Sequence, residues 1–184
     1  MTTPGPELLR SIKSMRNFLA DLSHLLQAAD RMMGESGWEP KDSNCLDGLS
    51  YSVSTGAKWM PGVASRTYRN ASDFPGIAIM IAIILMDDIE YKYELLEPVV
   101  AASVFKVADD FRIYGWQAHF FGWNKVSSDG KPLTMKKKDE PDWKSSWGWS
   151  ELTMLGRPLV EITNEGQLAE LVIQPVLKLI NKRA

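Results

Sequence analysis

The stretch LLRSIKSMRNFLADLSHLLQAADRMM, residues 8–33, decides the first element of the fold. Its apolar residues recur at alternating steps of four and three, the period of a helix that keeps one stripe against a partner helix or a core. We call this stripe the seam, and its members are Leu8, Ile12, Met15, Leu19, Leu22, Leu26, Ala29 and Met33. Four further apolar residues widen it, namely Leu9, Phe18, Leu25 and Met32. The pattern predicts a long amphipathic helix over residues 5–34.

The length of this helix leaves two interpretations open. From Leu8 to Met33 it runs roughly 39 Å at about 1.5 Å per residue, whereas a small domain is only about 30 Å across. The helix therefore either packs along the whole body of the protein or also projects to a partner. Gly34 and Gly37 suit its end, because glycine readily takes the left-handed conformation that closes many helices.

The longest apolar run, IAIMIAIILM over residues 77–86, predicts a central strand. It is about half as long as a membrane-spanning helix requires, so no membrane span is expected. Its β-branched residues favour a strand that is covered on both faces. Shorter apolar or alternating segments between turn residues predict further strands over residues 49–53, 63–69, 98–107, 112–123, 133–138 and 159–162.

The last part of the chain predicts a second helix over residues 164–182. Thr163 or Asn164 is expected to cap its start, since both side chains can accept a hydrogen bond from the first turn. Pro175 lies inside the apolar pattern and lacks a backbone donor, so a kink or break is expected near Gln174.

The order of these elements is helix, strands, helix. A run of strands joined by turns, without alternating helices, indicates an α+β fold with a mainly antiparallel central sheet. The two terminal helices are expected to pack on that sheet. The expectation is one domain over residues 1–184, with a strand-rich body over 49–162 that includes an irregular, Trp-rich loop over 139–150.

The composition argues against several classes of function. The 184 residues carry 21 Lys and Arg against 23 Asp and Glu, a formal net charge of −2, so the basic surplus of a typical nucleic-acid binder is missing. The single cysteine, Cys45, allows no internal disulfide and no cysteine-rich zinc site. No basic segment leads into an apolar run at the start of the chain, so a cytoplasmic protein is expected.

Two acidic pairs form a candidate metal site. Asp87 and Asp88 follow the predicted central strand, and Asp109 and Asp110 follow the strand predicted over 98–107. Carboxylates gathered at strand ends hold Mg²⁺ in many hydrolases, because a hard cation prefers oxygen ligands. The alternative is that they are ordinary solvated turn residues, since adjacent side chains in a strand point to opposite faces.

The strand predicted over 63–69 carries a candidate anion site. Alternation places Arg66 and Tyr68 on one face together with Ala64, and Arg69 on the other. A guanidinium group matches the geometry of a phosphate or a carboxylate, and a neighbouring phenol adds a second donor. The alternative is an edge strand that carries charged side chains on its surface.

Tryptophan is concentrated in one part of the chain. Five of the seven tryptophans lie between residues 116 and 149, and Trp143, Trp147 and Trp149 fall in the segment predicted to be irregular. Aromatic side chains in such a segment either fill space against the sheet or line a recognition surface for stacking a sugar or a nucleobase. Both interpretations are left open by the sequence.

The leading hypothesis is a non-enzymatic, cytoplasmic binding or protein-interaction module that binds a protein partner or itself as a homodimer. The chain shows no nucleophile elbow, phosphate loop or dinucleotide fingerprint, so no catalytic residue, cofactor or nucleic-acid partner is expected. Its candidate binding residues are Arg66, Tyr68, Trp143, Trp147 and Trp149. One alternative is a small-ligand binder with a pocket built from this Arg, Tyr and Trp set. The other is a Mg²⁺-dependent hydrolase of phosphoester type that uses Asp87, Asp88, Asp109 and Asp110.

Overall fold

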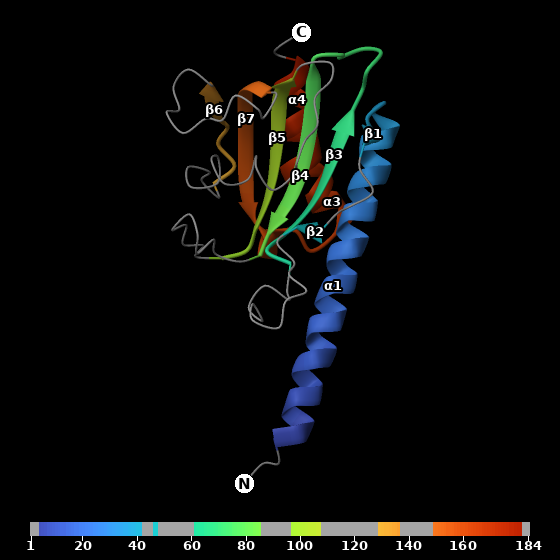
Figure 1. The fold of residues 1–184 in the computed structure, drawn as a ribbon, viewed down its shortest axis with the longest axis vertical. Helices are drawn as coiled ribbons and strands as arrows, with labels where there is room; N and C mark the ends of the chain where they lie inside the picture. Colours follow the sequence, from blue (N-terminus) through green and yellow to red (C-terminus); the bar gives the residue numbers. More distant parts are fainter. Residues whose placement is uncertain are drawn as a thin grey trace.

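The computed structural model describes residues 4–41, 46–47, 61–85, 97–107, 129–136 and 149–181. It shows an α+β fold, in which a long N-terminal helix and a C-terminal helix pack on an antiparallel sheet (Figure 1). The N-terminal elements are α1 (Pro4–Glu35), β1 (Glu39–Pro40), β2 (Leu46–Asp47), β3 (Val63–Arg69) and β4 (Ile77–Ile84). The others are β5 (Val99–Val107), β6 (Leu133–Lys136), β7 (Trp149–Pro158), the 3₁₀ turn η5 (Leu159–Glu161), α3 (Glu165–Leu168), the π-helical segment η6 (Ala169–Ile173) and α4 (Gln174–Asn181).

The sheet has the strand order β1-β3-β4-β5-β7-β6, and β2 pairs with the same strand as β1. Every pairing among the described strands is antiparallel. All eight residues of β4 pair with β5, and all seven residues of β3 pair with β4. The central strand predicted over 77–86 is therefore confirmed as Ile77–Ile84.

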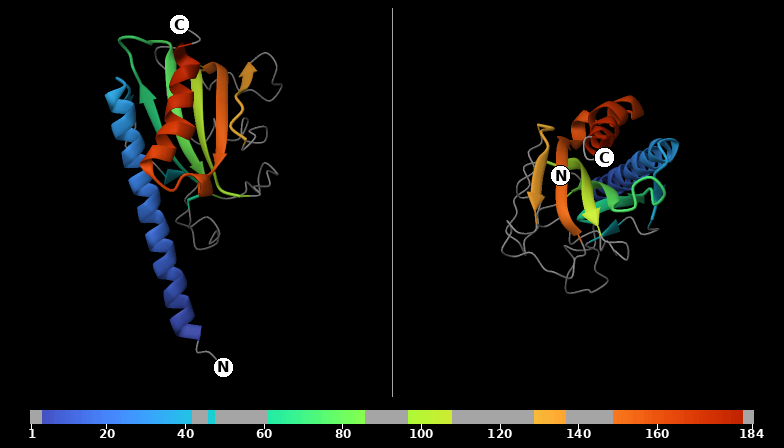
Figure 2. Two further views of the ribbon diagram at one scale, coloured as in Figure 1. Left: turned by 180° about the vertical axis from the view of Figure 1, so that it is seen from behind. Right: turned by 90° about the horizontal axis from the view of Figure 1, so that it is seen from above.

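Burial along β4 explains why its sequence is apolar without alternation. Ile79, Ile81 and Ile83 belong to the core that the sheet forms with the helices, whereas Met80 and Ala82 belong to a second core on the opposite face. Each of these five residues is at most 1% exposed. Both helices lie on the same side of the sheet, as the view from above shows (Figure 2). The strand is thus covered on both faces, as predicted.

The end of α1 is set by Gly37, which has a positive φ of 79°. The Trp38 amide donates to the Met33 carbonyl at 2.9 Å, and the Gly37 amide donates to the Gly34 carbonyl at 2.9 Å. This pair of bonds is the Schellman arrangement, and glycine suits its left-handed residue because it has no side chain to clash. Trp38 then enters the core and stacks on Phe74 with ring centroids 5.5 Å apart.

The C-terminal helix continues through Pro175 without a break, but it is irregular just before it. Asn164 caps its start by accepting a hydrogen bond from the Gln167 amide at 3.0 Å. The helix then widens into the π-helical segment η6, at whose end the Gln174 amide donates to the Ala169 carbonyl. Proline has no donor and clashes with the preceding turn of a regular α-helix, so a wider turn before it relieves both conflicts.

The strand predicted over 159–162 is wrong, because residues 159–161 form the 3₁₀ turn η5. The last strand is instead β7, whose first two residues fall within the segment over 139–150 that the sequence predicts to be an irregular loop. The strand escaped detection because Leu152, Thr153, Met154 and Leu155 are all buried, so its pattern does not alternate. Pro158 is the last residue of β7.

The remaining strand predictions divide into confirmed and undescribed ones. The strands over 63–69 and 98–107 are confirmed as β3 and β5. The segment over 133–138 contains β6, which pairs with β7. The predictions over 49–53 and 112–123 lie outside the described residues.

Candidate functional site

Asp30 on α1 joins the helix to β3. Arg66 donates to its carboxylate from Nε at 3.1 Å and from Nη2 at 2.7 Å, and Tyr68 donates from its hydroxyl at 2.9 Å. Arg66 and Tyr68 meet the same carboxylate because residues two apart in a strand share one face. Tyr68 is fully buried, and the side chains of Arg66 and Asp30 are 16% and 27% exposed. We call these three residues the Asp30 cluster.

The protonation of Tyr68 fits this role. Burial, followed by the negative charge of Asp30, raises the pKa of the Tyr68 phenol far above its ordinary value. The phenol therefore stays a donor throughout the physiological range, and the positive charge of Arg66 balances the carboxylate. Hydrogen bonds to a charged partner are stronger than neutral ones, so the Asp30 cluster holds α1 against the sheet.

The predicted anion site is thus occupied by a carboxylate of the same chain. The alternative of an edge strand is wrong, because β1 and β2 pair with the two ends of β3 while β4 pairs with its other side. Arg69 donates from Nη2 to the Pro75 carbonyl at 2.7 Å and takes no part in the cluster. Binding of an external ligand by Arg66 and Tyr68 stays a prediction.

Replacing Asp30 with alanine is expected to lower the free energy of unfolding by about 2 kcal/mol or more. The substitution leaves the half-buried Arg66 without its carboxylate and the buried Tyr68 hydroxyl without its acceptor. Denaturant melts measure the loss. The matched control is Glu35→Ala on the same helix, which is exposed and should change stability by no more than about 0.5 kcal/mol. An equal effect of the two substitutions would contradict the role given to the cluster.

The other feature of α1 is an exposed apolar stripe on its first half. The helix is 32 residues long, about 48 Å, and its N-terminal part runs well past the end of the sheet (Figure 1). Residues 5–17 are all exposed, whereas Leu22 and Leu26 further along the seam are buried. We call residues 4–17 the projecting half and residues 18–35 the body half. The exposed seam and flanking residues of the projecting half are Leu8, Leu9, Ile12 and Met15, which are 63%, 53%, 49% and 36% exposed.

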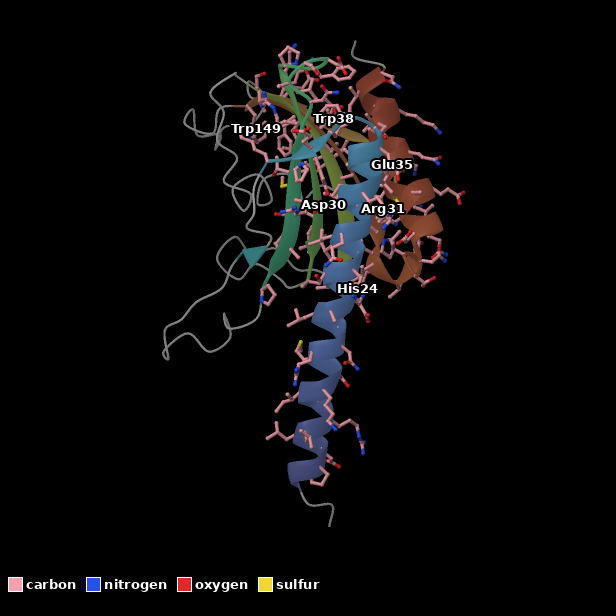
Figure 3. All side chains as sticks on the ribbon, turned by 90° about the vertical axis from the view of Figure 1, so that its right-hand side faces the viewer. His24, Asp30, Arg31, Glu35, Trp38 and Trp149 are labelled. Atoms are coloured by element: carbon pink, nitrogen blue, oxygen red, sulfur yellow. The ribbon has the colours of Figure 1, made fainter. Side chains whose placement is uncertain are left out.

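A groove of about 380 Å³ opens where α1 leaves the body. His24 lies at this point of the helix (Figure 3). The body half forms one wall, and the segment from η5 to α3 forms the other. The apolar side chains of these walls include Phe18, Leu22, Leu25, Leu159, Ile162 and Leu168.

The charged residues that line the groove, Asp21 and Glu165, are both acidic. Glu165 forms an exposed ion pair with Arg31, which ties α1 to α3. His24 and Asn164 add polar groups at the rim. The groove therefore offers an apolar floor with acidic and neutral polar groups around it.

Trp149 lies on the opposite face of the sheet from this groove (Figure 3). It is 3% exposed and meets Phe105 edge to face, with ring centroids 5.7 Å apart. This packing is what the space-filling alternative predicts for a tryptophan in this segment. Trp143 and Trp147 lie outside the described residues, so the structure does not bring the predicted Trp set together with Arg66 and Tyr68.

The acidic pairs proposed as metal ligands, Asp87 with Asp88 and Asp109 with Asp110, also lie outside the described residues. Within the described ranges, no group of three or more His, Cys, Asp or Glu side chains could hold a metal ion. In the same part of the chain, no helix is both long and apolar enough to cross a membrane.

Sequence reasoning missed Asp30 and the groove. Asp30 had a detectable signal, because it lies four residues after Leu26 and next to Ala29 of the seam, on the side of the helix that is buried. A charge in that position predicts a partner in the body. The groove had no such signal, since its two walls come from opposite ends of the chain. Comparison with known protein families, with curated proteins and with solved structures found no match to this chain.

Proposed function

We propose that this protein is a non-enzymatic interaction module that binds a protein partner through the projecting half of α1. The observation that carries the proposal is the exposure of Leu8, Leu9, Ile12 and Met15 on one helix. Among the described residues, Val160 is the one other large apolar side chain that is exposed. The exposed apolar groups are therefore concentrated in this segment. Clustered exposed apolar side chains of this kind mark interaction sites.

The helical form of the projecting half supports the same proposal. A helix of about 14 residues without tertiary packing is marginal in water, and most helix stability in proteins comes from burial of an apolar face. Leu8, Ile12 and Met15 have the spacing by which an amphipathic helix anchors in a groove. A cytoplasmic location is part of the proposal, because a chain with one cysteine suits a reducing compartment.

The test compares two substitutions on the same exposed helix turn. Ile12→Asp places a charge in the exposed seam, and Ser14→Asp places the same charge on the opposite face as the matched control. The tagged chain is used to capture partners from an extract of its native host. Untagged chain is added to the extract, because a second copy of the protein is one possible partner. Capture is expected with the native chain and with Ser14→Asp.

Loss of an apolar hot spot weakens binding by about 2 kcal/mol or more, so Ile12→Asp should lose most of the captured partner. Both variants should keep the native melting temperature, because residues 12 and 14 are exposed. If Ile12→Asp captures the same partners in the same amounts, the projecting half is not the binding element.

A further inference from the structure

The groove between α1 and the segment from η5 to α3 is built from fixed parts of the fold. Among its lining residues, Leu22, Ala28 and Leu168 are 5%, 4% and 1% exposed and belong to the core beneath the helices. The ion pair of Arg31 with Glu165 ties the two walls together. Sites for small molecules are usually preformed in this way and enclose about 300 to 1,000 Å³. The groove, at about 380 Å³, has the size for one compact ligand.

The polar side chains of the wall from η5 to α3 are already engaged within the chain. Asn164 accepts a hydrogen bond from the Gln167 amide at 3.0 Å, and Thr163 donates from its hydroxyl to Oε1 of Gln167 at 2.7 Å. Glu165 is paired with Arg31. These contacts are a helix cap and an exposed ion pair, so the polar groups of this wall are committed to the fold.

The polar side chains of the α1 wall lack such partners in the described part of the chain. Asp21 and His24 line the groove three residues apart, a spacing that makes them neighbours on one face of the helix. Among the described residues, neither side chain has a hydrogen-bond or ion-pair partner. A carboxylate that borders an apolar groove attracts a positive charge, and low-dielectric walls strengthen that attraction.

The charges of the groove favour the same kind of ligand. Its charged lining residues are Asp21 and Glu165, and no Lys or Arg of the described residues lines it. Arg31 offsets the charge of Glu165 from outside the lining, so the uncompensated charge is that of Asp21. An anion would be repelled here. A neutral ligand would partly cover the carboxylate and give it no partner, which costs free energy.

We propose that the groove binds a small organic cation, which consists of an ammonium group on a compact apolar body. The ammonium group donates to the Asp21 carboxylate, while the apolar body lies against Leu25, Leu159 and Ile162. His24 adds a hydrogen-bonding group beside the ammonium group. This site is separate from the projecting half, so it goes beyond the proposed function and does not depend on it.

The first experiment uses three probes that share one apolar body and differ in charge. They are 4-phenylbutylamine, which is cationic at neutral pH, 4-phenylbutan-1-ol, which is neutral, and 4-phenylbutyrate, which is anionic. The amine is expected to bind about tenfold more tightly than the alcohol, because it forms a charge-assisted hydrogen bond, and the butyrate should bind most weakly. Binding is measured by methyl NMR titration of the full chain, and the methyl signals of Leu25, Leu159 and Ile162 should shift with the amine.

The second experiment removes the charge of Asp21 without changing the size of the side chain. Asp21→Asn is expected to weaken binding of the amine about tenfold and to leave binding of the alcohol within about threefold of native. The matched control is Glu35→Gln, which removes a charge from the same helix outside the groove and should keep the native preference for the amine. Both positions are exposed, so both variants should keep the native melting temperature.

Equal affinity of the native chain for the amine and the alcohol would overturn the proposal, and so would a preference for the amine that persists in Asp21→Asn. Absence of amine binding at millimolar concentration would overturn it as well. If the peptide acetyl-Leu-Lys-Leu-amide bound in an Asp21-dependent way and the amine did not, the groove would be assigned to a protein partner instead. Ile12→Asp should bind the amine like the native chain, so failure of this proposal and failure of the proposed function are distinguishable.

Discussion

Replacing Leu26 with aspartate is expected to unfold the protein under conditions in which the Leu8→Asp variant remains fully folded. Both residues belong to the same seam and lie 18 positions, or about five helical turns, apart, so they point in the same direction from the helix axis. Leu26 is 5% exposed, whereas Leu8 is 63% exposed. A carboxylate at position 26 would be taken out of water without a partner, at a cost of about 4 kcal/mol or more.

The Leu8→Asp substitution serves as the matched control. An exposed surface change alters stability by no more than about 0.5 kcal/mol, and an acidic residue in the first turns of a helix is favourable. Thermal and denaturant melts at low protein concentration measure both variants, so that self-association does not contribute. Equal losses in the two variants would mean that the projecting half is packed as tightly as the body half.

Replacing Trp149 with alanine is expected to lower the free energy of unfolding by about 3 to 5 kcal/mol. The side chain is 3% exposed and packs edge to face on Phe105, so its removal leaves a large cavity in the core on the face of the sheet opposite α1 and α4. Trp149 also opens β7, where it pairs with Val107. The substitution therefore destabilises the start of a strand as well as the core.

Denaturant melts of Trp149→Ala are compared with those of Ser150→Ala, the exposed neighbour in the same strand. The control should change stability little, because its side chain is not packed. A Trp149→Ala variant of native stability and weakened partner binding would mean that Trp149 is a recognition residue instead. The two outcomes can be separated by melts before any partner is known.

The regular elements were predictable where local periodicity decides them. The seam predicted α1 within a residue of its bounds, and the apolar run over 77–86 predicted β4. Pro175 predicted a kink or break near Gln174, where the helix instead stays continuous and is π-helical just before the proline. Strand β7 was not predictable in the same way. Its side chains are buried on both faces of the sheet, Leu155 in the core beneath the helices and Leu152 and Met154 in the core on the opposite face, which weakens the alternation that identifies a half-buried strand.

The candidate site was predictable only in part. Alternation in β3 placed Arg66 and Tyr68 on one face and indicated a carboxylate or phosphate between them. That the carboxylate is Asp30 depends on how α1 lies across the sheet, and residues 36 positions apart in the chain carry no local signal of that contact. The groove depends on the meeting of α1 with the segment from η5 to α3, which are separated by more than a hundred residues.

The sequence by itself determined that residues 5–34 form one amphipathic helix, because the apolar period is a local property of the chain. It also determined that the two halves of this helix carry opposite net charge. Only the tertiary structure decided where along that seam the core ends. An apolar stripe has the same sequence pattern whether a sheet covers it or water does, and here the sheet covers Leu22 and Leu26 but not Leu8 or Ile12. The exposed part of the helix is therefore set by the size and position of the sheet beneath it.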